Sequence, residues 1–93
     1  MGMHMFRVTL ACEGVPATAG NAAALDIQKE FAEFRQHHRN VVCTFANGEL
    51  VLTAENDFDP KGLALMDEFS DCISAYIVES FGGRIRLVDA VSV

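Results

Sequence analysis

The sequence predicts an α+β fold in which six elements follow one another as strand, helix, strand, strand, helix, strand. Two runs of alternating apolar and polar residues, 41–46 and 49–55, flank Asn47-Gly48, the preferred centre of a two-residue type I′ hairpin turn. On each side of this hairpin lies a stretch with apolar residues three and four apart, as in an amphipathic helix. A further alternating segment stands near each end of the chain, and such alternation predicts a half-buried strand.

The elements of the first half have separate local support. Alternation over residues 5–11 predicts the first strand, and a helical pattern over 21–38 predicts the first helix. The helix is expected to end in His37-His38-Arg39, because the helix dipole favours cations at its C-terminus. In the hairpin, pairing of residues 46 and 49 makes one face wholly apolar. The pairs on that face are Phe45 with Leu50, Cys43 with Leu52, and Val41 with Ala54.

The second helix is predicted to begin at Asp59-Pro60 and to end at Gly82-Gly83. Aspartate can accept hydrogen bonds from the free amides of a first helical turn, and proline at the first helical position gives up no needed donor. Residues 84–93 alternate again. Asp89 falls among the apolar positions of this last strand, which predicts a bulge or a frayed end there.

This order of elements is that of the ferredoxin-like βαββαβ plait, a four-stranded antiparallel sheet of order 4132 with two helices on one face. We expect one domain over residues 1–93, with residues 1–4 disordered or ahead of the natural start. The topology resembles that of ACT-type amino-acid-binding regulatory domains and of dimeric ferredoxin-like barrels. The resemblance is one of topology, since the first loop, Glu13-Gly-Val-Pro-Ala, differs from the Asp-x-Pro-Gly turn of ACT domains.

Composition narrows the classes of function. The formal net charge of −6 disfavours binding to nucleic acid or to an anionic membrane surface. No apolar run approaches the roughly 18 residues of a membrane span, and no signal sequence is evident, so we expect a cytoplasmic protein. With glycine counted and tyrosine left out, the apolar fraction is about 57%, above the roughly 45–50% that is typical. This surplus predicts a homodimer or another protein partner.

The uncovered face of the sheet is the first candidate interface. By strand parity it holds Arg7, Thr9, Val42, Thr44, Val51, Thr53, Arg86 and Val88. One hypothesis is a dimer or partner interface, in which the valines are buried and the arginines pair with Glu49 or Glu55 across the seam. The other is an ordinary solvated face with cross-strand Arg and Glu pairs.

A small-ligand site is the alternative function. The topology brings the first loop, the first helix N-terminus and the start of the last strand together, so that Glu13, Gly14, Gly20, Gly83 and Arg84 could bind a small anion as an ACT-like regulatory domain would. The same glycines could serve only to shape a loop and cap a helix. No phosphate-cradling motif is present.

The remaining polar groups predict no catalytic residue, no metal site and no cofactor. Glu55, Asp57 and Asp59 lack the Gly and Glu of a calcium loop and are interpreted as helix-capping acids. His37 and His38, if adjacent on a helix, diverge by about 100° and cannot chelate one ion. The three cysteines are expected to be buried, although Cys12 at the first loop could be a reactive thiol. We therefore expect a protein that is not an enzyme.

Overall fold

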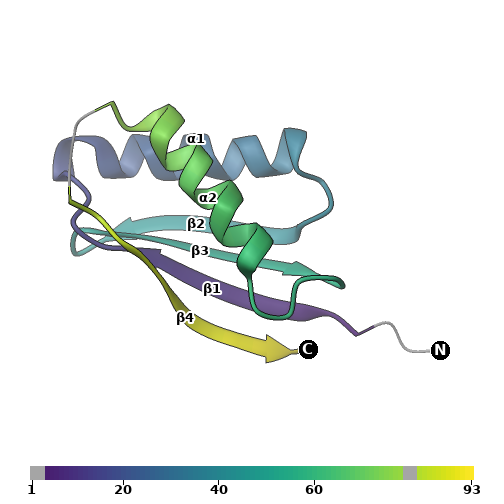
Figure 1. The fold of residues 1–93 in the computed structure, drawn as a ribbon. Coiled ribbons are helices and arrows are strands. Elements are labelled where there is room, and N and C mark those ends of the chain that lie inside the picture. Colours follow the sequence, from purple (N-terminus) through teal and green to yellow (C-terminus); the bar gives the residue numbers. More distant parts are fainter. Residues whose placement is uncertain (1–3, 79–81) are drawn as a thin grey trace.

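The computed structural model describes residues 4–78 and 82–93 and confirms the α+β class and the order of six elements (Figure 1). The strands are β1 (Phe6–Cys12), β2 (Arg39–Ala46), β3 (Glu49–Asn56) and β4 (Ile85–Ser92), and the helices are α1 (Ala17–Phe34) and α2 (Leu63–Tyr76). No helix within the described residues is both long and apolar enough to cross a membrane. The expectation about residues 1–4 falls largely on residues 1–3, which lie outside the described part of the chain.

The four strands form one antiparallel sheet in the order β2-β3-β1-β4, which is 4-1-3-2 when counted from the β4 edge. Figure 1 shows both helices above the same face of this sheet. The core lies between the two layers. Its largest fully buried apolar side chains are those of Phe31, Phe69, Leu10, Ile27, Leu50, Leu52, Leu65 and Val8. The opposite face, which we call the open face, is covered by neither helix.

The hairpin between β2 and β3 has the predicted turn and register. Asn47 and Gly48 both adopt positive φ, 54° and 77°, as a type I′ turn requires. The pairs run from Ala46 with Glu49 to Val42 with Thr53, and the register then shifts between Arg39 and Val42. The predicted pairing of Val41 with Ala54 therefore falls in an irregular part of the ladder.

Both helices differ from the prediction at their ends. Helix α1 begins at Ala17 and ends at Phe34, so that residues 35–38 form a loop rather than a last helical turn. Helix α2 begins at Leu63, after a turn closed by a hydrogen bond from the Gly62 N–H to the Asp59 carbonyl. The Asp59 side chain still accepts from helix amides, as predicted, but its partners are the N–H groups of Leu63 and Leu65. The predicted stop at Gly82-Gly83 is wrong, because α2 ends at Tyr76.

Strand β4 contains the predicted bulge. The register with β1 shifts between Thr9 and Leu10, which pair with Asp89 and Leu87 and leave Val88 as the extra residue. Beyond the bulge the faces exchange, so that Asp89 lies beside Thr9 and Val91 beside Arg7 on the open face. Val91 and Leu87 therefore lie on opposite faces of the sheet, although a regular alternation would place them on the same face.

Candidate functional site

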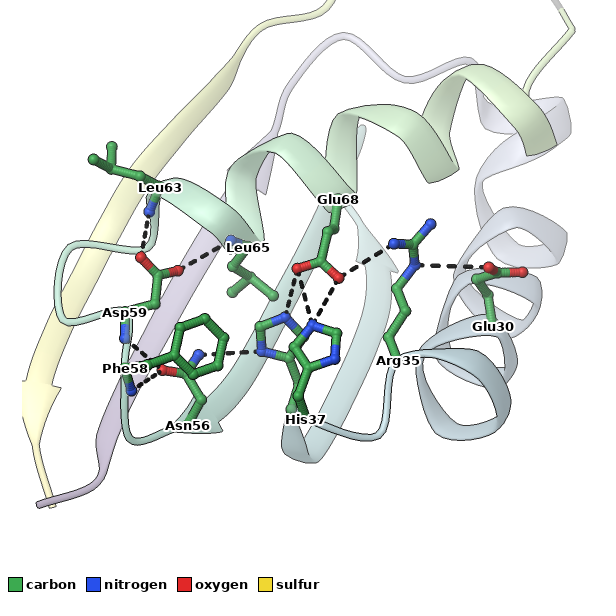
Figure 2. A network of polar contacts seen from close by, with 10 residues as sticks. Glu30, Arg35, His37, Asn56, Phe58, Asp59, Leu63, Leu65 and Glu68 are labelled. Atoms are coloured by element: carbon green, nitrogen blue, oxygen red, sulfur yellow. Dashed lines mark hydrogen bonds and ion pairs between the residues drawn. The ribbon is translucent and has the colours of Figure 1, made fainter. Parts of the chain in front are cut away.

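The densest group of polar side chains lies where the α1–β2 loop meets α2. The Glu68 carboxylate accepts hydrogen bonds from Arg35 Nη1 at 3.2 Å, from His37 Nε2 at 3.1 Å and from His38 Nε2 at 2.8 Å. Figure 2 shows Arg35 and His37, which follow α1, directed toward Glu68 on α2. The His38 side chain is fully buried, whereas that of His37 is half exposed.

A chain of hydrogen bonds fixes the proton on the His38 ring. Asn56 Oδ1 accepts from the backbone N–H groups of Phe58 and Asp59, at 3.1 and 2.8 Å, which points its amide nitrogen toward His38. That nitrogen lies 3.1 Å from His38 Nδ1 and donates to it, so Nδ1 is the acceptor of the ring. The ring proton is then on Nε2 and is donated to Glu68. We call these five side chains, Arg35, His37, His38, Asn56 and Glu68, the Glu68 clamp.

The geometry of the clamp raises the question of a metal ion, since ligand atoms of His37, His38 and Glu68 all lie within 4.8 Å of one another. A histidine ligand must offer a free lone pair, but Nε2 of His38 carries the proton that Glu68 accepts. Moving this proton to Nδ1 would direct it at the Asn56 amide group, and rotating that amide would remove the acceptor of two backbone N–H groups. We therefore interpret the clamp as a structural tie between the α1–β2 loop, β3 and α2.

The clamp also changes the acidity of Glu68. Burial by itself would raise the pKa of this carboxyl group, but the hydrogen bonds from His38, His37 and Arg35 outweigh burial and hold its pKa below the usual range. The carboxylate is thus charged over a wider pH range than an exposed glutamate.

The open face carries an ion pair toward each end. Arg7 Nε lies 2.9 Å from Glu55 Oε2, and Asn40 also donates to this carboxylate. Arg86 lies 2.8 Å from Glu49 and 3.6 Å from Glu13. The arginines therefore pair within the chain, with the glutamates that were expected to meet them from across a seam.

Between these ion pairs the open face is made of valine and threonine. Thr9 and Thr53 lie side by side with their hydroxyl oxygens 3.3 Å apart, and Val51 is half-buried. Thr44 is exposed, Val42 and Val88 are each about half exposed, and Val91 joins them through the bulge. All eight predicted interface residues thus lie on strands, and the valines give this face an apolar surface without a covering layer.

Four of the five residues predicted for a small ligand come together, and one does not. The Glu13 N–H donates to the Arg84 carbonyl, and Gly14 packs against the backbone of Gly83. Gly20 instead faces the core, where a Cβ atom would overlap the Phe45 ring. Packing therefore explains why the residue at this position has no side chain. Within the described residues, the buried side-chain atom without a hydrogen-bond partner is Arg35 Nε, at the other end of α1, so no buried unpartnered side-chain atom of this part of the chain lies at the loop.

The cysteines are buried, as predicted. Burial, and to a lesser extent the neighbouring Glu13 carboxylate, raises the pKa of the Cys12 thiol. The same desolvation raises the pKa of Cys43 to about 12. A nucleophilic cysteine needs the opposite change, so the hypothesis of a reactive Cys12 is not supported.

Comparison with known protein families finds no family model that matches this chain. No characterised protein matches its sequence either.

The Glu68 clamp is the feature that sequence reasoning missed. The prediction that α1 continues to His38 separated the two histidine side chains, whereas in the loop their ring centroids are 4.3 Å apart. Asn56 and Asp59, three residues apart after a strand, are a pattern typical of side chains that bind nearby backbone amides. That pattern could have located the turn, but nothing local to it indicates Glu68.

Proposed function

We propose that this protein is a non-catalytic interaction module that associates with a second copy of itself through the open face. The observation that carries the proposal is the distribution of charge. Residues 5–13, 39–56 and 82–93, which hold the strands, contain four arginines and four acidic residues. Residues 14–38 and 57–81, which hold the helices, account for the whole net charge of −6. Two copies can therefore bring their sheets together without opposing their net charges.

The composition of the open face supports the same proposal. Its half-exposed valines, Val42 and Val88, can lose their remaining contact with water in an interface. The ion pairs of Arg7 with Glu55 and of Arg86 with Glu49 stand outside this apolar middle. An apolar centre with a polar rim is the usual arrangement of a protein interface.

The fold is compatible with this use. We assign the βαββαβ order, with β1 and β3 central and both helices on one face, to the ferredoxin-like class. In this arrangement one whole face of the sheet is left to a partner. Because both copies carry this surface, they can form a twofold-symmetric dimer, in which each residue of the face contributes to the interface from both copies.

The experiment is sedimentation velocity over a dilution series, comparing the natural chain with Val42→Lys. Burying the exposed half of Val42 contributes about 0.8 kcal/mol per copy, so its loss from both copies weakens the dimer at least about tenfold, before the cost of burying a lysine. Leu25→Lys, on an exposed position of α1, is the matched control and should leave the association unchanged. Equal dissociation constants for Val42→Lys and the natural chain would refute the proposal.

A further inference from the structure

The two edges of the sheet are protected differently. At the β2 edge, the Cys43 N–H donates to the Gln28 side chain of α1. Strand β4 forms the other edge, and its side chains are exposed on both faces, with Leu87 46% and Val88 49% accessible. An exposed apolar edge strand is a template for pairing with another strand.

Two hydrogen bonds show which backbone groups of β4 are available. The Arg84 carbonyl accepts from the Glu13 N–H, and the Val93 N–H donates to the Met5 carbonyl. The backbone groups of Arg84 and Val93 are therefore directed toward the β1 side. Backbone groups alternate between inward and outward along an antiparallel strand, and the bulge takes up one residue. The residues whose N–H and C=O groups point outward are therefore Ile85, Leu87, Ala90 and Ser92.

We propose that β4 pairs in antiparallel with β4 of a second copy, about a twofold axis between Val88 and Asp89. In this register Leu87 faces Ala90 of the partner subunit. Ile85 faces Ser92 of the partner subunit in the same way. Every outward backbone group then meets another outward group, and side chains from the helix-side face lie beside side chains from the same face.

Neighbouring registers do not have this property. A shift of one residue in either direction sets Leu87 opposite Asp89 or Val91, whose backbone groups are directed toward β1. The bulge at the middle of the strand is what makes the two halves complementary to each other. A second copy of this strand is thus the occupant that fits the edge, and the strand segments carry no net charge to oppose it.

Asp89 controls this contact. Its Oδ1 accepts from the outward N–H of Ala90 at 3.0 Å, the group that Leu87 of the partner subunit would bind. The carboxylate competes with the pairing and keeps it reversible, as charged side chains on edge strands commonly do. Asp89→Ala removes the competing carboxylate, so each copy gains about one net hydrogen bond in the dimer. We therefore expect the dissociation constant of the dimer to fall roughly tenfold or more. Asp71→Ala, an exposed position of α2, removes the same charge elsewhere and is the control.

The decisive measurement is amide hydrogen exchange by NMR at low and high protein concentration, for the natural chain and for Asp89→Ala. The outward amides of Ile85, Leu87 and Ser92 should gain protection with concentration, and more strongly in the variant. The inward amides of Arg86 and Val91 should stay equally protected throughout. A chain that dimerises without this alternating change, or that stays monomeric in both forms at millimolar concentration, would overturn the proposal.

The Val42→Lys variant separates the test of β4 pairing from the test of association through the open face. In Val42→Lys the alternating change on β4 should persist even if the association measured by sedimentation weakens, because Val42 lies on β2 at the other edge of the sheet. Loss of the alternating change in Val42→Lys would count against the edge pairing and leave the open face as the interface.

Discussion

Replacing Glu68 with leucine should destabilise the protein by about 2–4 kcal/mol. The Nε2–H of His38 is on a fully buried side chain, and leaving such a donor unsatisfied costs about 1–3 kcal/mol. The Arg35 side chain is one-quarter exposed and retains its ion pair with Glu30 at 3.6 Å. Loss of its hydrogen bond to Glu68 therefore adds only about 1 kcal/mol to the destabilisation. His37 is half exposed and exchanges its partner for water at little cost.

This loss is a large part of the roughly 5–14 kcal/mol expected for 93 residues, and it can be measured by urea unfolding. The chain has no tryptophan and one tyrosine, so far-UV circular dichroism is the appropriate probe. Asp67→Leu, at the exposed neighbouring position of α2, removes the same charge and is the control. A loss below about 1 kcal/mol for Glu68→Leu relative to Asp67→Leu would refute the interpretation of the clamp as a structural tie.

The pH dependence gives the same prediction a second test. Because the folded-state pKa of Glu68 lies below its unfolded value of about 4.3, its contribution is complete above that value and is lost as pH falls through the folded-state pKa. The difference in stability between the natural chain and Glu68→Leu should therefore shrink as pH falls below about 4.3. A difference that grew as pH fell below this value would contradict the assigned hydrogen bonds.

Three further outcomes are expected. Gly20→Ala should destabilise the chain by about 1–3 kcal/mol in urea unfolding, because the new Cβ atom would meet the Phe45 ring. Helix propensity alone would favour the opposite result, since alanine stabilises a helix relative to glycine. The additional substitution Phe45→Leu should remove most of this loss. Cys12 should react with iodoacetamide at neutral pH at least about tenfold more slowly than glutathione, because its thiol is buried and its pKa is raised. Rapid labelling of the folded chain would contradict this. Zinc ions should not raise the thermal midpoint, and a rise that His38→Gln abolishes would restore the metal hypothesis.

The parts of the fold that sequence could predict are those determined by neighbouring residues. Asn47-Gly48 tolerates the positive φ of the turn, and the turn then sets the register of both strands. The bulge near Asp89 was predictable for a similar reason, because one charged residue interrupted an otherwise alternating strand. In each case the local pattern and the tertiary structure favour the same conformation.

The helix ends were less predictable because contacts distant in sequence determine them. Residues 35–38 could continue α1 by local preference, but burial of His38 and its bonds to Asn56 and Glu68 place these residues in a loop. At α2, Gly62 takes a positive φ of 73° and packs against Val8 of β1, so the helix starts after it rather than at Pro60. None of the three partners, Asn56, Glu68 and Val8, is within ten residues of the helix end that it affects.

The candidate interfaces follow from the same separation of local and distant effects. The alternation of each strand could be predicted, and it places Val42 and Val88 on the open face. The sequence could not predict which edge of the sheet is available for pairing, because this depends on the hydrogen bond between Gln28 of α1 and the Cys43 N–H of β2. The open face and the β4 edge use different atoms, since the first offers side chains and the second backbone groups. If both proposed contacts form, four copies make two eight-stranded sheets packed face to face, with the acidic helices on the outside.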